Sequence, residues 1–317
     1  MQDIKAILPA KDKWVSIVWQ VNDWCNFRCT YCSEWNWAGR NKNDTDIDTI
    51  VNTLERIMLH YKAKGYKYFK LYLSGGEPTF WKALIPVVEK FREHAEWPGS
   101  CVGINTNFSK PLSWWKDHHH LFEDVVASYH AEWSKDDKYM DVYKFLQDKK
   151  NYLCSRIMMH HDHFEQCMAF GDRIKNECDN YMIEYAPVYD ELRPSTDPYH
   201  YEEQWKMDFF KTNSTVQQQS IPIKKDPSYA WAKVQYEDDT IEAIDTNGII
   251  TNGKNFFKGW LCNIHESLHI HPNGRIQQAS CGVGPLLGNI VQGEFNTTMS
   301  EGVWCPKTHC HCAADFN

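Results

Sequence analysis

The sequence predicts an α/β protein: a partial (β/α)6 barrel of the TIM type, followed by a small cysteine-rich extension built from a β-hairpin and helix. Two observations support this prediction. Six buried-strand patterns alternate with helical patterns over about the first 190 residues, which is typical of a parallel sheet covered by helices. The alternation then stops, and five of the twelve cysteines gather in the last 56 residues.

The first predicted strand, residues 14–21, is a nearly continuous apolar run (WVSIVWQV), as expected for a strand that is buried on both faces. The helix expected at 48–64 has apolar residues at helical spacing, and Gly65 follows it in the position of a C-terminal cap. The same two patterns predict further strand and helix pairs at 68–73 and 81–93, 101–105 and 112–121, 124–128 and 140–148, and 154–159 and 164–175, and a sixth strand at 181–185.

The change of pattern near residue 190 predicts three parts, which are a barrel core at 1–190, a linker or insertion at 191–229, and the extension at 230–317. The linker is polar, although residues 201–210 could form one short helix. In the extension, the turn residues Pro272-Asn273-Gly274 predict a hairpin between Cys262 and Cys281. Short strands are also expected there, at 230–234 and 240–250.

Composition narrows the possible partners and the compartment. The formal charge is -8, from 34 basic and 42 acidic side chains, and no long run of Lys and Arg offers a broad surface for nucleic acid or anionic lipid. The chain has no signal-peptide pattern and no apolar stretch long enough to span a membrane. We therefore expect a cytoplasmic protein whose thiols are reduced, in which metal or cluster ligation explains many of the cysteines.

Three cysteines follow the first strand at close spacing, in Cys25-Asn-Phe-Arg-Cys29-Thr-Tyr-Cys32. Three thiolates so close in sequence can bind three irons of a cubane cluster and leave the fourth iron open. A closed zinc site is the alternative, but it needs four ligands, and the nearest histidine, His60, lies beyond a predicted helix. The spacing therefore favours an iron–sulfur cluster.

A second motif follows the second strand, where Gly75, Gly76, Glu77 and Pro78 end the run Leu71-Tyr-Leu-Ser. Parallel barrels place their active-site loops at these strand ends. Glycines allow a ligand to approach the backbone closely, and a carboxylate can hold an ammonium group. The motif therefore predicts a ligand-binding loop.

Together, the two motifs resemble those of the radical S-adenosylmethionine superfamily. The resemblance implies a [4Fe-4S] cluster on Cys25, Cys29 and Cys32, with S-adenosylmethionine (AdoMet) bound at its open iron. It further implies that Tyr31 lies near the adenine and that the Gly75–Pro78 motif binds the amino group of the methionine moiety. An external one-electron reductant, similar to flavodoxin or ferredoxin, would supply the electron that cleaves AdoMet.

Polar residues also follow the later strands. Asn105, Ser128 and Arg156 correspond by resemblance to positions that contact the ribose or the methionine carboxylate. His130 and Glu132 would lie where substrate is expected, and could steer or deprotonate it. Strand-end residues with only structural hydrogen bonds are the alternative for each of them.

The C-terminal cysteines are Cys262, Cys281, Cys305, Cys310 and Cys312. With the hairpin and the element Leu287-Gly288-Asn289-Ile290, they resemble the SPASM extension or its shorter twitch form. Five cysteines can fully ligate one cubane, so we expect a single auxiliary [4Fe-4S] cluster with one cysteine spare. A structural zinc site is the alternative, because His309 and His311 are interleaved with these cysteines.

The expected activity is hydrogen-atom abstraction from a substrate by a 5′-deoxyadenosyl radical. The expected substrate is a peptide or protein side chain, and the alternative is oxidation or epimerisation of a small molecule such as a sugar or cyclitol. A non-catalytic zinc-binding protein is a more remote alternative, because the open three-cysteine loop occurs together with Gly-Gly-Glu-Pro.

Overall fold

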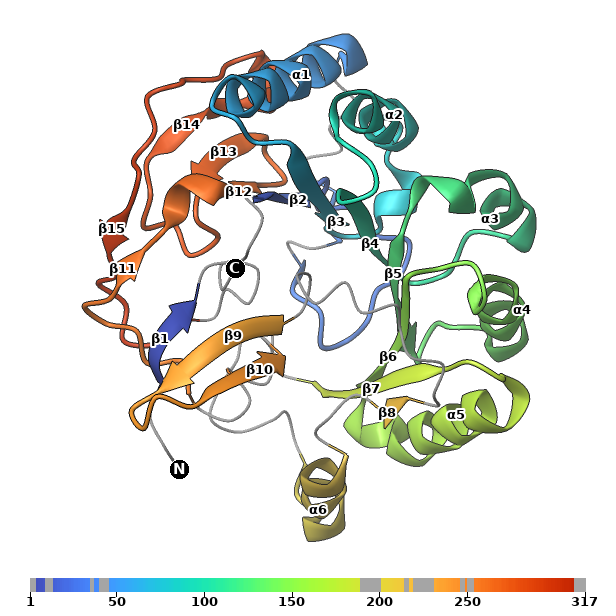
Figure 1. The fold of residues 1–317 in the computed structure, drawn as a ribbon. Helices are drawn as coiled ribbons and strands as arrows, with labels where there is room; N and C mark the ends of the chain where they lie inside the picture. The colour runs from blue at the N-terminus through green and yellow to red at the C-terminus, as the bar shows by residue number, and fades with distance from the viewer. Residues whose placement is uncertain are drawn as a thin grey trace.

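The computed structural model describes most of the chain, and the central feature of the fold is a curved sheet of ten strands (Figure 1). Along this sheet the strands run in the order β14-β13-β12-β2-β3-β4-β5-β6-β7-β8. The residues that the structure describes are 4–8, 14–34, 37–39, 46–188, 201–213, 217–218, 231–245, 249 and 254–310.

Six neighbouring strands of this sheet are parallel, and five helices lie along its outer side (Figure 1). The sheet does not close into a full barrel, so the predicted partial (β/α)6 barrel is confirmed. The strands are β2 (Trp14–Gln20), β3 (Tyr68–Ser74), β4 (Cys101–Thr106), β5 (Asp124–His130), β6 (Tyr152–Met159) and β7 (Met182–Pro187). The helices are α1 (Ile47–Ala63), α2 (Leu84–His94), α3 (Leu112–His118), α4 (Asp136–Leu146) and α5 (Phe164–Glu177).

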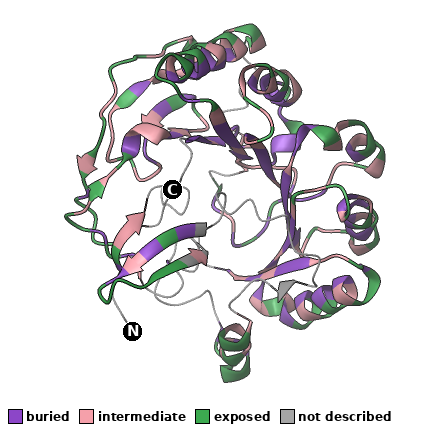
Figure 2. Ribbon diagram, in the orientation of Figure 1, coloured by how far each residue is buried: buried purple, intermediate pink, exposed green. Residues whose placement is uncertain are grey.

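The main core lies between the sheet and the helices, where Figure 2 shows buried residues on the strands and on the inner sides of the helices. In register, Ile17 of β2 stands beside Leu71 of β3, and both belong to this core together with Leu54 and Ile57 of α1. Burying one such side chain stabilises the fold by about 1.5–3 kcal/mol. Because successive strand residues alternate in direction, the neighbours of these core residues face the interior of the barrel.

The helix ends follow local chemistry. The Asp46 side chain caps α1 by accepting a hydrogen bond from the Asp48 amide at 3.1 Å, and Gly65 follows the helix with φ = +88°. Helix α4 begins four residues earlier than the sequence pattern suggested, at Asp136. Acidic residues in a first turn favour helix initiation, and Asp136 and Asp137 occupy that turn.

The C-terminal segment joins the barrel sheet. Strand β12 (Ser267–Ile270) runs parallel to β2, with Ser267 beside Ser16, and pairs antiparallel with β13 (Arg275–Gln278) across the expected hairpin. Gly274 in the turn has φ = +85°, a conformation that favours glycine. Strand β14 (Leu286–Asn289) completes this edge of the sheet.

A second, small sheet joins the N-terminal strand to a hairpin at 231–245. Strand β1 (Ile4–Leu8), which the sequence pattern did not reveal, pairs with β9 (Trp231–Tyr236), and β9 pairs with β10 (Ile241–Asp245). Ile4, Val234 and Phe257 belong to its separate apolar core. Nearby, β11 (Leu261–Cys262) pairs with β15 (Val303–Trp304). The three-part division expected from the sequence stays a prediction.

Shorter elements complete the described chain. Helix α6 (Gln204–Thr212) falls within the expected linker, and the two-residue strand β8 (Gln217–Gln218) follows it in the chain. None of the described helices has both the length and the apolarity needed to cross a bilayer. The 3-10 helices are η2 (Pro78–Phe80), η3 (His119–Leu121), η4 (His161–His163), η6 (Ile264–Glu266) and η7 (Ile290–Gln292).

Candidate active site

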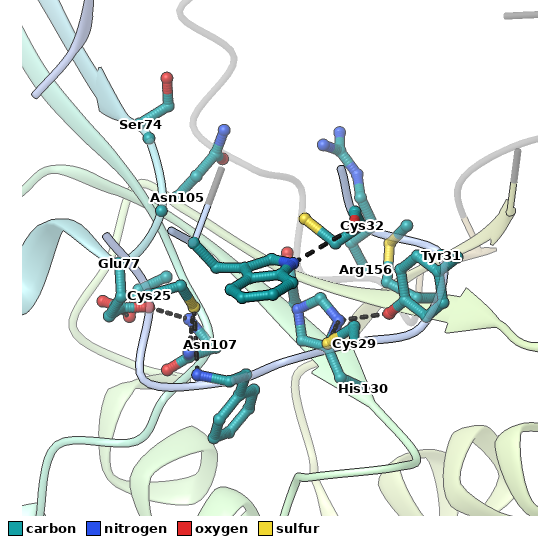
Figure 3. A pocket seen from close by; sticks show the side chains of 17 residues that line it. Cys25, Cys29, Tyr31, Cys32, Ser74, Glu77, Asn105, Asn107, His130 and Arg156 are labelled. Atoms are coloured by element: carbon teal, nitrogen blue, oxygen red, sulfur yellow. Dashed lines mark hydrogen bonds between the residues drawn. The ribbon is translucent and has the colours of Figure 1, made fainter. Parts of the chain in front are cut away.

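A cavity of about 280 Å³ opens at the carboxyl ends of the parallel strands, where the sequence placed the site (Figure 3). Side chains that follow or end β2, β3, β4, β5 and β6 all reach it. Most of the residues predicted for the AdoMet site line it, namely Cys25, Cys29, Tyr31, Cys32, Gly75, Gly76, Glu77, Asn105, Ser128, His130 and Arg156. Pro78 and Glu132 lie outside this lining set.

The three thiols of the cysteine loop therefore border one cavity. A turn, in which the Cys32 amide donates to the Cys29 carbonyl at 3.0 Å, holds two of them close in the chain. Burial raises the pKa of the Cys25 thiol to about 12, and it also raises that of Cys29. Without a metal the thiols of Cys25 and Cys29 are therefore protonated at neutral pH, whereas a bound iron would deprotonate them.

Backbone hydrogen bonds join the glycine motif to the segment just before Cys25. The Gly76 amide donates to the Asn22 carbonyl at 3.1 Å, and the Glu77 amide donates to the Trp24 carbonyl at 2.8 Å. Gly75 has φ = +134°, and a β-carbon there would come within 2.5 Å of the Asn22 carbonyl oxygen. Only glycine fits this close approach, so the two motifs form one structural unit.

The Glu77 carboxylate is 1% exposed and accepts hydrogen bonds from several groups. Oε1 accepts from the Thr79 amide at 3.1 Å, from the Thr79 hydroxyl at 2.7 Å and from the Thr106 hydroxyl at 2.8 Å, while Oε2 accepts from the Asn107 amide at 2.7 Å. Burial raises the pKa of Glu77, and these donors oppose that effect. The carboxylate thus ties the glycine loop to the end of β4 and begins η2, where Pro78 is buried. Its predicted contact with an ammonium group stays a prediction.

Polar side chains of the inner strand faces form another wall of the cavity. Arg156 lies in register beside Ser128 of β5 and Glu184 of β7, and its Nε donates to Glu184 Oε2 at 2.7 Å. On the other side, the Tyr72 hydroxyl donates to Asn105 Oδ1 at 2.9 Å. The barrel interior thus presents fixed hydrogen-bonding groups, including a guanidinium, to whatever the cavity holds.

His130 and Glu132 contact the cysteine loop. His130 Nδ1 lies 3.5 Å from Cys29 Sγ and within hydrogen-bond reach of the Tyr31 hydroxyl, as the dashed lines in Figure 3 show. Burial lowers the pKa of His130 to about 4, so the imidazole is neutral at ordinary pH. Glu132 accepts from the Thr30 amide through both oxygens, at 3.1 and 3.4 Å. Their predicted action on substrate stays a prediction.

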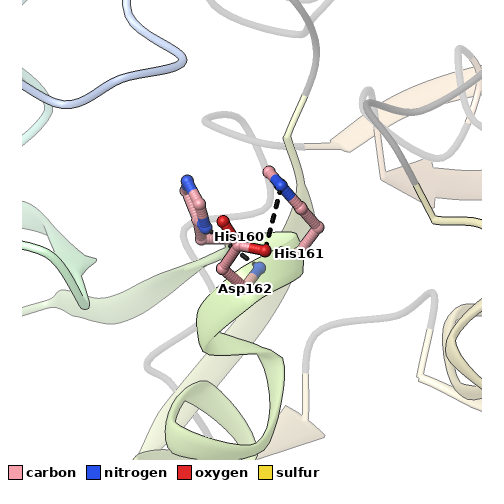
Figure 4. A group of neighbouring side chains, drawn as sticks. All are labelled: His160, His161 and Asp162. Carbon is pink, nitrogen blue, oxygen red and sulfur yellow. Dashed lines mark hydrogen bonds and ion pairs between the residues drawn. The ribbon is translucent and has the colours of Figure 1, made fainter.

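His160, His161 and Asp162 follow β6 and have the side-chain types of a metal site (Figure 4). Both nitrogens of His160 are already engaged, because Nε2 lies 3.0 Å from the Thr30 hydroxyl and Nδ1 accepts from the Asp162 amide at 3.2 Å. His161 Nε2 pairs with Asp162 Oδ1 at 3.2 Å. These contacts give the three side chains a structural role, because they begin η4 and support the cysteine loop.

The backbones of three C-terminal cysteines are each placed by contacts within the extension. Cys262 lies in β11 opposite Val303, the Cys305 amide donates to the Trp260 carbonyl at 2.8 Å, and the Cys310 amide donates to the Asn255 carbonyl at 2.9 Å. Cys281 follows β13, three residues after Gln278, whose side chain reaches back to the Ile264 and Ser300 carbonyls. Cys312 lies outside the described residues, as does His311.

Several lining residues were not foreseen, among them Phe27, Trp37 and Met158. Apolar residue types do not by themselves indicate a binding site in a sequence. A positional signal exists for Trp37, since it lies five residues after the third cysteine, and its indole donates to the Cys32 carbonyl at 3.3 Å. Asn107, a polar residue expected after β4, also lines the cavity, and its Nδ2 lies 3.7 Å from Cys25 Sγ.

Comparisons with known proteins bear on the fold of the chain. No family model matches the chain. The solved structures of native and hexahistidine-tagged anSMEcpe with bound AdoMet match it with TM-scores of 0.51 and 0.53 at 14% identity, covering 88% of this chain and 78% and 75% of those chains. This likeness shows the fold, in agreement with the partial barrel expected from the sequence.

One curated relative is similar in sequence over a short stretch. The GTP 3′,8-cyclase of Rhizobium leguminosarum bv. trifolii (strain WSM2304) is 34% identical over 90 residues, which are 28% of this chain and 24% of the cyclase. The match therefore spans about a quarter of that relative's length.

Proposed function

We propose that this chain, which has the fold of the radical S-adenosylmethionine enzymes, cleaves AdoMet reductively and removes a hydrogen atom from a peptide or protein side chain. The observation that carries the proposal is the meeting of three cysteine thiols, a glycine loop and the Ser128–Arg156 wall around one cavity. The cysteine loop and the glycine loop are far apart in sequence, yet the backbone bonds of Asn22 and Trp24 join them.

The residues present fit both cofactors. Three soft thiolate donors on one eight-residue loop suit a four-iron cluster that keeps one iron open, and the three cysteines border the same cavity as the glycine loop. When bound, the cluster and AdoMet supply electron transfer and a 5′-deoxyadenosyl radical, and the protein supplies orientation and shielding.

The chain's own side chains can orient AdoMet. A guanidinium binds carboxylates through paired N–H donors, so Arg156, held at Nε by Glu184, would face the methionine carboxylate. Ser128 and Asn105 offer hydrogen bonds from the neighbouring strands, and the backbone at Gly75 and Gly76 allows close approach. Tyr31 would lie beside the adenine.

Apolar side chains would keep water away from the reacting carbon. Phe27, Trp37 and Met158 line the cavity, and Trp133 stacks on Phe27 with ring centroids 6.0 Å apart. Excluding water matters because a carbon radical must react with its substrate rather than with other hydrogen donors. These side chains also cover the thiols that would carry the cluster.

Four of the five C-terminal cysteines would hold one auxiliary [4Fe-4S] cluster. The backbone bonds that tie the segments of Cys305 and Cys310 to Trp260 and Asn255, close in the chain to Cys262, support this. An external reductant such as flavodoxin or ferredoxin would supply the electron for AdoMet cleavage, and a cluster held by these cysteines would supply a second centre for electron transfer.

A second candidate substrate is a small polar molecule such as a sugar or cyclitol. The polar groups of Tyr72, Arg156 and Glu184 on the inner strand faces favour it, because hydroxyl groups need hydrogen-bond partners inside a cavity. The cysteine arrangement that resembles SPASM and twitch extensions favours the peptide.

Anaerobic reconstitution tests the proposal. We expect about eight irons per chain and 5′-deoxyadenosine after dithionite and AdoMet are added. Cys29→Ala should lose the cleavage, whereas Cys178→Ala, at a buried cysteine away from the cavity, should keep it. Bound zinc without cleavage would contradict the proposal. Incubation with a peptide encoded beside the gene, and separately with cyclitols, then separates the two substrate classes by the product mass.

A further inference from the structure

Three side chains from the ends of β5 and β6 hold the cysteine loop at consecutive residues. His130 contacts Cys29 and Tyr31, Glu132 accepts from the Thr30 amide, and His160 Nε2 lies 3.0 Å from the Thr30 hydroxyl. The loop thus rests on the barrel at the middle cysteine of the motif. Of the three side chains, only His130 is within reach of a cysteine sulfur in the described contacts, at 3.5 Å.

His130 is itself firmly placed. Its amide donates to the Ser134 hydroxyl at 3.0 Å, and its ring lies nearly parallel to the Tyr31 ring, with centroids 6.0 Å apart. Phe27 meets it edge-on, with centroids 5.9 Å apart. A side chain held on three sides keeps its nitrogen aimed at one point without a large entropic cost.

We propose that His130 is a positioning residue for the iron–sulfur cluster, donating an N–H···S hydrogen bond from Nδ1 to the Cys29 thiolate. This inference rests on the proposed function, because it concerns the same cluster. A thiolate bound to iron carries no proton and can only accept, so the imidazole must be the donor. Hydrogen bonds to the sulfurs of a cluster stabilise its reduced state and raise its reduction potential.

The Tyr31 hydroxyl shares the same nitrogen, so the imidazole joins the sulfur of one loop residue to the ring of another. With Nδ1 protonated, both the sulfur and the phenol oxygen accept from it. The Tyr31 hydroxyl also hydrogen-bonds to Cys29, so Tyr31→Phe removes both a competing acceptor and a second donor to the sulfur. The test therefore rests on variants of His130.

Redox titration of the reconstituted protein, followed by electron paramagnetic resonance, tests the hydrogen bond. His130→Leu should shift the midpoint potential of the AdoMet-binding cluster to more negative values. His130→Asn, whose amide places an N–H near the position of Nδ1, should restore most of the shift. His94→Leu is the matched control, because His94 pairs with Glu55 at 2.9 Å and does not line the cavity. Equal potentials in wild type and His130→Leu would overturn the inference.

A measurement on the wild-type protein covers the case in which His130→Leu binds no iron. With ¹⁵N-labelled histidine, the reduced cluster should show a ¹⁵N coupling and an exchangeable proton in electron–nuclear double resonance. Both should persist in His160→Asn, which removes the other nearby imidazole. A wild-type cluster without this coupling overturns the inference and leaves the proposed function standing, whereas a wild-type chain that binds no iron overturns both.

Discussion

Arg156 and Glu184 stand side by side on the parallel strands β6 and β7 and form an ion pair, with 2.7 Å between Nε and Oε2. About 30% of the arginine side chain and 27% of the glutamate side chain are exposed, and the arginine lines the cavity. Because Glu184 engages Nε, it fixes the plane of the guanidinium and leaves the terminal nitrogens for a ligand.

Glu184→Gln should weaken AdoMet binding about tenfold, because losing a charge-assisted hydrogen bond of about 1.5 kcal/mol frees the guanidinium to rotate. Isothermal titration of the reconstituted protein with AdoMet measures the change. Glu177→Gln is a suitable control, since Glu177 makes surface ion pairs with Lys144 and Arg173 far from the cavity. Unchanged affinity in Glu184→Gln would show that the ion pair does not orient the arginine.

Gly75→Ala should abolish AdoMet binding. The new β-carbon would lie 2.5 Å from the Asn22 carbonyl oxygen at φ = +134°, and the backbone conformation alone costs about 1–3 kcal/mol for a residue with a side chain. Gly65→Ala is the matched control: its φ is also positive, at +88°, but a β-carbon there meets nothing within 4 Å. Thermal unfolding and AdoMet titration of both variants check this, and binding by Gly75→Ala at wild-type affinity would exclude the close approach.

Gln278→Ala should destabilise the fold by roughly 2–4 kcal/mol. The side chain is fully buried, donates to the Ser300 carbonyl at 3.0 Å and accepts from the Ser300 amide at 2.9 Å, which would be left without these partners. Denaturant unfolding measures the loss. Gln292→Ala, at an exposed residue of η7, should change stability by less than about 0.5 kcal/mol. Similar values for both variants would contradict the structural role.

Protonation of His269 should lower the free energy of unfolding as the pH falls. Burial lowers its pKa from 6.5 to about 4, so between these values the unfolded chain binds a proton that the folded chain does not. Stability therefore decreases as the pH falls from about 7 to 5, by up to about 2 kcal/mol from this group. Denaturant unfolding at several pH values, in chelator so that metal release does not contribute, measures the slope. His269→Gln should flatten it, and parallel slopes in both proteins would refute the assignment.

Local patterns in the sequence were sufficient for the barrel. The apolar run of β2, the helical spacing of α1 and the cap at Gly65 depend on residues close in the chain, so each could be recognised without knowing its neighbours in space. The two cofactor motifs have the same property, because their chemistry depends on spacing within eight and four residues. Parallel strand ends meet on one side of a barrel, which explains why both motifs border one cavity.

Other features depended on partners far along the chain. The Glu77 carboxylate accepts hydrogen bonds from the Thr106 hydroxyl and the Asn107 amide. His130 contacts Cys29, which lies 101 residues before it in the chain. In both cases the type of residue and its strand-end position were visible in the sequence. The direction of the side chain was not, because it follows from the register and curvature of the sheet.

The sequence by itself determined the fold class and the three-cysteine and glycine motifs, because apolar periodicity and ligand spacing are properties of neighbouring residues. The tertiary structure alone decided that β12 extends the barrel beside β2, that β1 pairs with β9, and that Arg156 in the cavity wall forms an ion pair with Glu184. These pairings join segments separated by long stretches of chain. They are selected by the packing and hydrogen bonding of the whole molecule, which no short stretch of sequence encodes.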